Sequence, residues 1–393
     1  MRPTPCADLR VVDFSQVLAG PYVGRILAEL GADVIKVEAP AGDLTRLIAP
    51  RRDRGMSGLY VWANLGKRNV CIDLAKPEGR ELALGLVARC DAVLENFRPG
   101  VAERLGIGWE AVHAANPRAV MVSISGFGHD STLRDRGAFA PTMHAATGLL
   151  EYAARKSGHP VHPLADAHAD LATALHAAVA VLAALRQAER TGEGERVELA
   201  MYDAVLATFS ETPFELLDPP ELRPEPRPFD AGAHGWIAIA GPPQHVWSEL
   251  RKAFPEIEDP APAGADLETK ARLRHAAVET WMRGRPSREE LVGRLEGANL
   301  PCAVVQSLRE ALEGPFGRER DLLLEVDDGR GGRRRVTRLP YRFSRSGMAR
   351  PRSAPRRGEH NEEVLREVLE LGAERIRALA EAGVLLAPGP GED

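Results

Sequence analysis

Residues 9–38 read LRVVDFSQVLAGPYVGRILAELGADVIKVE, and this stretch decides the fold class. β-Branched residues are frequent at 9–14 and at 33–38, which predicts two strands. Between them, Gly20-Pro21 opens a helix whose apolar residues recur at helical spacing, and Gly31 closes it. A strand, a helix and a second strand in this order are typical of a parallel sheet covered by helices.

The same alternation continues beyond this unit. It predicts further strands at 70–74, 92–97, 119–125 and 196–201, and helices at 77–90, 99–105 and 170–190. Central turns of the last helix are apolar on nearly every side, which predicts a buried helix. Ligands of parallel sheets bind beyond the carboxyl ends of the strands, so the segments that follow the strands are expected to surround one site. These segments are residues 15–20, 38–43, 96–100 and 126–128.

Composition changes at Pro213, after which prolines are frequent up to Pro228. We therefore expect an α/β protein with a large Rossmann-like parallel-sheet domain, a stiff linker and a smaller α+β domain. The expected ranges are 1–205 and 318–393 for the large domain, 206–228 for the Pro-rich linker and 229–317 for the small domain. The basic segment at 317–357 is expected to form a solvated hairpin and its loops, because no aromatic residues interleave with its arginines.

Bulk properties exclude several classes of protein. The chain of 393 residues is 44% hydrophobic and has a net charge of -5, which indicates a globular protein without affinity for nucleic acid. Residues 1–8 do not begin a signal peptide, and the longest apolar stretch, 174–185, is too short to cross a bilayer. The four cysteines form no CxxC pair. We expect a cytoplasmic protein that does not bind membranes.

Two common kinds of site receive little support. A nicotinamide site requires G-x-G-x-x-G after the first strand, but this turn reads VLAGP at 17–21. A metal site is suggested by the alternation of Asp166, His168 and Asp170, yet the sequence offers no further cluster of ligands. We therefore expect no metal, and a nicotinamide enzyme stays a weak alternative.

Asp170 has two readings on the residues alone. An Asp before an apolar helical run is the usual N-cap, which needs no catalytic role. A carboxylate held ionised at a helix N-terminus is also a suitable nucleophile toward a thioester. The spacing does not decide between these readings.

Several segments, in order along nearly the whole chain, resemble the family III CoA-transferases, the CaiB/BaiF group. They are residues 12–21, 30–38, 42–43, 64–68, 95–100, 125–128, 170–185, 190–194 and 358–365. The resemblance implies an interlocked, ring-like homodimer. It also implies an enzyme that transfers coenzyme A from an acyl-CoA to a small carboxylic acid, with CoA as substrate and no permanently bound cofactor.

The resemblance assigns roles to individual residues. The family's nucleophilic aspartate falls thirteen residues before an Ala-Ala-Leu, which here is 183–185, so it corresponds to Asp170 and not to Asp166. It implies an aspartyl mixed anhydride and then an aspartyl-CoA thioester, with backbone amides of 126–128 as candidate oxyanion donors. Arg46 is a further candidate for CoA phosphates. The residues implied to bind CoA are Gln16, Val17, Ala19, Lys67, Arg68, Asn96, Phe97 and Arg104.

This sequence departs from the family pattern at a few positions. Phe139 stands where the family's 2-methylacyl-CoA racemases carry a catalytic histidine, and His144 stands where transferases tend to carry glutamine. Ala174 replaces a smaller glycine. Racemisation is thus a disfavoured alternative, and a non-catalytic CoA-binding homologue is a third reading. The segment between 203 and 236 is short and lacks the glycine-rich loop of formyl-CoA transferases, which disfavours formyl or oxalyl substrates.

Overall fold

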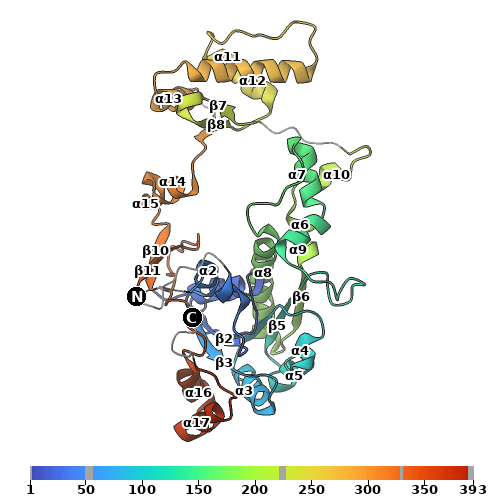
Figure 1. The fold of residues 1–393 in the computed structure, drawn as a ribbon, viewed down its shortest axis with the longest axis vertical. Helices are drawn as coiled ribbons and strands as arrows, with labels where there is room; N and C mark the ends of the chain where they lie inside the picture. The colour runs from blue at the N-terminus through green and yellow to red at the C-terminus, as the bar shows by residue number, and fades with distance from the viewer. Residues whose placement is uncertain (1, 49–55, 221–226, 299, 328–330, 388–393) are drawn as a thin grey trace. The chain divides into compact units, whose positions relative to one another are not determined.

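The computed structural model describes residues 2–48, 56–220, 227–298, 300–327 and 331–387. The chain forms two compact units, a large unit of Met1–Ser210 with Leu323–Asp393 and a small unit of Glu211–Leu322 (Figure 1). The expected linker, 206–228, spans the change from the large to the small unit, and its residues 221–226 lie outside the described residues.

A six-stranded sheet forms the centre of the large unit, with every neighbouring pair of strands parallel. Its strand order is β3-β2-β1-β4-β5-β6, which is the doubly wound order expected of a Rossmann-like core. From β1 the strands are added outward to β3 on one side of the sheet, and from β4 outward to β6 on the other. The carboxyl ends of β1 and β4, where this order reverses, therefore border the usual ligand crevice. The strands are β1 Arg10–Asp13, β2 Asp33–Glu38, β3 Arg68–Cys71, β4 Ala92–Glu95, β5 Val120–Ser125 and β6 Arg196–Ala200.

Both faces of the sheet are covered, as its almost continuously apolar strands require. Alternate residues of a strand point to opposite faces, so Val11 enters one core and Val12 the other. The first core contains α1 (Ala19–Glu29), α6 (Ala140–Ala146), α8 (His168–Thr191) and α9 (Met201–Thr208). The second contains α3 (Pro77–Val87), α5 (Trp109–Ala115), α16 (Asn361–Leu369) and α17 (Ala373–Glu381).

Most predicted elements of the large unit are present, with small shifts of their ends. The strand expected at 70–74 begins two residues earlier, at Arg68, and the basic segment contains an antiparallel hairpin of β10 (Leu323–Asp327) and β11 (Arg333–Thr337). The helix expected at 99–105 is present as the shorter α4 (Val101–Arg104). Helices that the sequence analysis did not identify include η1 (Leu44–Leu47), α2 (Gly58–Asn64) and α7 (Leu149–Ser157).

Helix α8 differs from the prediction of a fully buried helix. It packs against α1, α9 and β5, but Leu175, Val179 and Leu182 leave one side of it exposed. By length and composition alone α8 is apolar enough to cross a membrane, a test that core helices also pass. Its packing in the first core identifies it as a core helix.

The small unit has its own core around a three-stranded antiparallel sheet, β7-β8-β9. Its strands are β7 Phe229–Asp230, β8 Trp236–Ile239 and β9 Cys302–Val304. Its helices are α10 Thr212–Glu215, η2 Gly232–His234, α11 Pro243–Ala253, α12 Leu267–Arg283, α13 Arg288–Gly297, α14 Leu308–Glu313 and α15 Pro315–Glu319.

Candidate active site

Asp170 lies in the first turn of α8, as the third residue of the helix. The N-cap position belongs to Ala167, so Asp170 is not the cap of its helix. Its carboxylate instead faces the backbone N–H groups of Ala19 and Ala140, the first residues of α1 and α6, in addition to its own. No N-cap side chain accepts a hydrogen bond at the start of α1, α6 or α8. One carboxylate therefore serves orphan N–H groups from three helices.

The surroundings of Asp170 make its carboxyl unusually basic. Burial raises the pKa of Asp170 from its usual 3.8 to about 6, although the N–H groups of Ala19 and Ala140 act in the opposite direction. Among the described residues no ion pair involves Asp170, and part of its side chain reaches the surface. The group is thus ionised at neutral pH without a cation to neutralise it.

The turn between β1 and α1 brings several predicted residues together at the carboxyl edge of the sheet. Asn96, just after β4, accepts from the N–H of Gln16 and donates to its carbonyl oxygen, both at 2.7 Å. Val17 follows with a φ of +67°, and Ala19 then begins α1. The turn at 15–20 and Asn96 therefore lie together, as the sheet topology predicted. Asp170, which that prediction did not include, adjoins this turn through the N–H of Ala19.

A buried ion network lies beneath this turn. It consists of Asp13, Lys36, Asp43 and Lys67, whose side chains are all fully buried. Lys36 Nζ lies 2.9 Å from Asp43 Oδ2, and Lys67 Nζ lies 2.8 Å from Asp13 Oδ2. The network fixes the ends of β1 and β2.

Lys67 does not reach a ligand in this arrangement. Besides Asp13, its ammonium donates to the carbonyl oxygen of Pro21 at 2.8 Å and to Asn64 Oδ1 at 2.9 Å, which uses all three N–H donors. Arg46 is likewise engaged, since it pairs with Glu38 at 2.8 Å and contacts the ring of Tyr60. Both cations hold the fold together instead of facing the surface.

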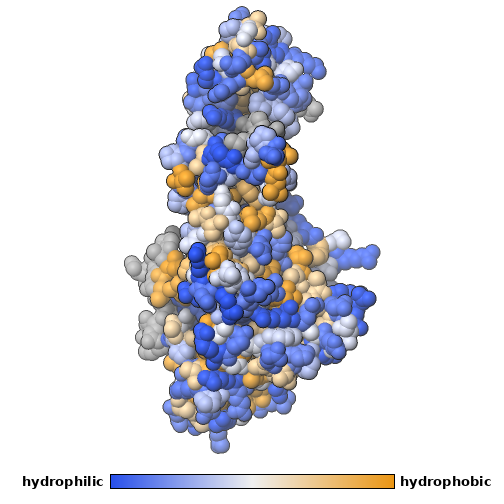
Figure 2. All heavy atoms as spheres, turned by 90° about the vertical axis from the view of Figure 1, so that its right-hand side faces the viewer, coloured by the Kyte–Doolittle hydropathy of each residue, from blue (hydrophilic) through white to orange (hydrophobic). Residues whose placement is uncertain are grey.

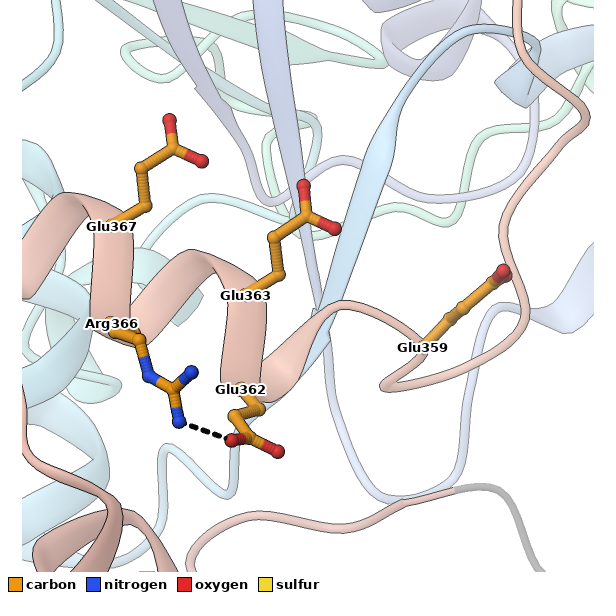
Figure 3. A pocket seen from close by; sticks show the side chains of 5 residues that line it. All are labelled: Glu359, Glu362, Glu363, Arg366 and Glu367. Atoms are coloured by element: carbon orange, nitrogen blue, oxygen red, sulfur yellow. Dashed lines mark hydrogen bonds and ion pairs between the residues drawn. The ribbon is translucent and has the colours of Figure 1, made fainter.

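Arg68 lies at the opposite, amino edge of the sheet. The structure therefore does not bring it together with the other predicted residues. Its guanidinium bonds Asp33 at the start of β2 and reaches Glu367 of α16 at 2.9 Å. An open groove beside this edge is lined by four glutamates and Arg366, as Figure 3 shows. This charge disfavours phosphate there.

The remaining predicted residues follow β4. Phe97 packs partly against the second core, while Arg104 of α4 is exposed, and the described residues show no ion pair for it. Of the suggested oxyanion donors, Gly128 donates its N–H to Ser125 Oγ at 3.0 Å. The N–H groups that act on the Asp170 carboxylate are instead those of Ala19, Ala140 and Asp170 itself.

His144 of α6 supports the first turn of α8, a contact that the sequence did not predict. Its Nε2 accepts the N–H of Ala169 at 3.1 Å, and only 2% of the residue is exposed. Burial, together with nearby His168, lowers the pKa of His144, so the ring is neutral and carries its proton on Nδ1. No cluster of three or more metal-ligating side chains occurs in the part of the chain that the structure describes.

Comparison with known proteins decides the family. The model of CoA-transferase family III matches residues 6–361. The chain belongs to this family. The succinyl-CoA:mesaconate CoA-transferase of Haloarcula marismortui is 33% identical, over 94% of this chain and 98% of the relative. The formyl-CoA:oxalate CoA-transferase of Streptomyces coelicolor is also 33% identical, over 96% of this chain and 98% of the relative. A CaiB/BaiF family protein from Brucella suis has the same fold, with a TM-score of 0.79 at 26% identity over 93% of this chain and 100% of that protein.

The resemblance read from the ordered motifs is thus confirmed, and the protein is a family III CoA-transferase. Its closing motif has a structural explanation. Asn69 of β3 accepts from the N–H of Gly358 at 2.6 Å, and His360 and Asn361 bond the backbone of Asn69 and Cys71. The motif therefore covers the free edge of β3, which an open sheet must protect.

Proposed function

We propose that this family III CoA-transferase moves coenzyme A from an acyl-CoA donor to a carboxylic acid through covalent intermediates on Asp170. The Asp170 carboxylate carries the proposal, because it combines partial exposure with a pKa of about 6 and lacks a cation partner among the described residues. Such a group is ionised at neutral pH and more basic than an ordinary aspartate, as an effective carboxylate nucleophile should be.

The reaction needs four displacements and no net proton transfer. An oxygen of Asp170 attacks the thioester carbonyl, the C–S bond breaks, and CoA leaves as a thiolate from a mixed anhydride. The thiolate attacks the acyl carbon of Asp170, releases the donor as a carboxylate and forms an aspartyl-CoA thioester. The acceptor carboxylate displaces the thiolate to form a second anhydride. The thiolate then attacks the acceptor carbonyl, which yields the product acyl-CoA and restores Asp170.

Backbone donors at Asp170 suit this sequence. Each tetrahedral intermediate on the aspartyl carbon places negative charge on an oxygen that the N–H groups of Ala19 and Ala140 already face. Donors fixed in advance at helix N-termini stabilise such charge without reorganisation. The same groups therefore hold the resting carboxylate and its reacting forms.

We place CoA along the carboxyl edge of the sheet. The proposed contacts are Gln16, Val17, Ala19, Asn96, Phe97 and the exposed Arg104, whose guanidinium suits a phosphate. Lys67 and Arg68 are not among them, because Lys67 has no free donor and Arg68 lies at the amino edge.

Neither Phe139 nor His144 is placed to act as the base of a racemase. Phe139 has no proton to exchange, and the Nε2 of nearby His144 already accepts the N–H of Ala169. A non-catalytic family member would bind CoA along the same edge but would exchange none between acids. The exchange assay described below therefore distinguishes it from a transferase.

For the substrates, the named relatives suggest dicarboxylic acids. One relative is a succinyl-CoA:mesaconate and another a formyl-CoA:oxalate CoA-transferase. Because no glycine-rich loop is visible between 203 and 236, we propose succinyl-CoA as the first donor to test and C4 or C5 dicarboxylates as acceptors.

We also propose a cytoplasmic, interlocked homodimer. Leu175, Val179 and Leu182 of α8 are 48%, 70% and 37% exposed and fall on one helix face. Figure 2 shows separate hydrophobic groups among a largely hydrophilic surface. A second copy of the chain is the natural cover for this face, and the four free cysteines suit a reducing compartment.

Asp170→Asn tests the proposed function, with Asp166→Asn as the matched control four residues earlier. Exchange of CoA between succinyl-CoA and a panel of acids (mesaconate, malate, oxalate) should fall at least about a thousandfold in Asp170→Asn, because the nucleophile is lost. It should stay within about twofold in Asp166→Asn, an exposed residue. Hydroxylamine added during turnover should label Asp170, as peptide mass spectrometry would show. Full activity of Asp170→Asn would refute the assignment.

A further inference from the structure

The turn between β1 and α1 contains a backbone conformation that its sequence disfavours. Val17 has a φ of +67°, in the left-handed region that β-branched residues rarely adopt. Such a conformation is strained and persists only where neighbouring contacts impose it. Two residues later α1 begins with Ala19, whose N–H faces the Asp170 carboxylate.

Contacts to three side chains impose this conformation. Asn96 bonds both backbone groups of Gln16 at 2.7 Å, and Lys36 donates to the carbonyl oxygen of Ser15 at 2.8 Å. Asp43 Oδ1 accepts the N–H of Val17 itself at 3.2 Å. Of these three contacts, this last bond is the one made to the strained residue itself.

Asp43 is held firmly enough to fix Val17. Its Oδ2 pairs with Lys36 Nζ at 2.9 Å, and its Oδ1 accepts the N–H and the hydroxyl of Thr45 at 2.9 and 2.7 Å. Only 1% of the residue is exposed, so no substrate reaches it. Its carboxylate orientation is therefore set by the interior of the protein.

We propose that Asp43 is a positioning residue for the transfer reaction, which holds Val17 in the left-handed conformation and so directs the N–H of Ala19 at Asp170. The inference rests on the proposed function, because that assigns the nucleophile to Asp170. Loss of the Asp43 bond lets Val17 relax to a negative φ and turns the N–H of Ala19 away. The Asp170 carboxyl then loses a donor, and so does each oxyanion formed on it.

Glycine at position 17 separates this role from a purely structural one. Glycine adopts positive and negative φ about equally, so Val17→Gly removes the drive to relax. In an Asp43→Ala background, which lacks any acceptor for the N–H of Val17, Val17→Gly should therefore recover activity. It should not recover stability, because Lys36 still lacks its charged partner.

The experiment compares Asp43→Ala, Val17→Gly, their double variant and Glu29→Gln in the full chain. Glu29 is the control, since it also forms a buried ion pair, with Arg25 at 2.6 Å, but at the far end of α1. Asp43→Ala should lower kcat for CoA exchange roughly ten- to a hundredfold. It should change the KM for acyl-CoA little and move the acidic limb of the pH–rate profile to higher pH. The double variant should regain roughly tenfold in kcat relative to the single Asp43 variant, while its Tm stays as low as in that variant. Glu29→Gln should lower Tm without moving the acidic limb of the pH–rate profile.

A further substitution covers the case in which Asp43→Ala does not fold. Val17→Pro forbids a positive φ and removes the N–H, yet leaves the Asp43–Lys36 pair intact. It should lower kcat as Asp43→Ala does. The proposal is overturned if Val17→Pro keeps the wild-type kcat, or if kcat follows Tm alike in all variants and the double variant recovers nothing.

Failure of the proposed function is read separately. Full exchange by Asp170→Asn refutes Asp170 as nucleophile. In that case the Asp170 pKa, measured by ¹³C NMR of the carboxyl and assigned with Asp170→Asn, still tests the positioning. A higher pKa in Val17→Pro supports the contact between the turn and Asp170, and an unchanged pKa refutes it.

Discussion

Asp43 and Asp170 are two carboxylates on either side of the same turn, and their environments differ in kind. Burial acts to raise the pKa of both. At Asp43, Lys36 and the Thr45 donors outweigh burial and hold its pKa below the usual value. At Asp170 only backbone N–H groups oppose burial, and the pKa rises to about 6. The paired carboxylate shapes the backbone, whereas the unpaired one is available for chemistry.

The basic side chains differ in the same way, since some are paired within the protein and one is exposed. Lys67, Arg46 and Arg68 all form ion pairs within the protein, while Arg104 is exposed and has no ion pair among the described residues. A phosphate bound by any of the first three must replace an existing partner. We therefore expect their loss to affect the stability of the fold and the loss of Arg104 to affect the affinity for CoA.

The largest effect should follow Lys67→Met. It leaves the Asp13 carboxylate fully buried without a charged partner, which destabilises proteins by about 3–5 kcal/mol. Urea unfolding measures this loss, and CoA binding by the folded protein should be unchanged. Arg104→Ala provides the contrast, with stability within about 0.5 kcal/mol of wild type and CoA affinity roughly tenfold weaker. A stable Lys67→Met protein with weakened CoA binding would show that Lys67 contacts the ligand after all.

Much of the fold was predictable from local sequence, because its signals are short-range. The β-branched runs and the spacing of apolar residues in α1 identify the first three elements, and parallel strands place the turn at 15–20 and Asn96 at one edge. Asp170 was singled out as the candidate nucleophile only through the family resemblance, since its spacing fitted an N-cap equally well.

What was missed depends on distant partners. Arg68 pairs with Glu367, which is 299 residues away, and no local pattern reveals that this side chain points to the amino edge. The left-handed conformation of Val17 could not be predicted either, because glycine is the residue usually found in that conformation. The exposed face of α8 was read as buried, since an apolar sequence pattern does not distinguish a side packed in the core from one that lies at the surface.

An intermediate effect tests the cost of the unpaired carboxylate. Asp170→Asn should stabilise the fold at pH 8, because the wild type keeps an anion there that its surroundings disfavour. A rise in pKa from 3.8 to about 6 corresponds to at most about 3 kcal/mol, and partial exposure reduces this to roughly 1–3 kcal/mol.

The raised pKa of Asp170 also predicts how wild-type stability changes with pH. Between pH 3.8 and about 6 the folded state keeps a proton that the unfolded state has lost, so wild-type stability falls as pH rises through this window. Asp170→Asn should lack this fall, and its advantage should vanish below about pH 4. Chemical unfolding of both proteins at several pH values measures it. Equal stability at pH 8 would mean that the carboxylate is better compensated than its contacts suggest.

The smallest effect concerns His144, the contact by which α6 holds the first turn of α8 beside Asp170. His144→Leu leaves the N–H of Ala169 buried without its acceptor, which should cost roughly 1–2 kcal/mol in stability. His144→Gln offers an amide oxygen to the same N–H and should retain most of the stability and activity.

The wild-type histidine also adds a pH dependence, because its folded pKa lies below the ordinary 6.5. As pH falls below 6.5, the unfolded state binds the proton first, so wild-type stability declines, and His144→Gln should remove that decline. If the leucine and glutamine variants lose stability and kcat equally, the bond to Ala169 does not support the nucleophile, and packing alone explains why this ring is buried.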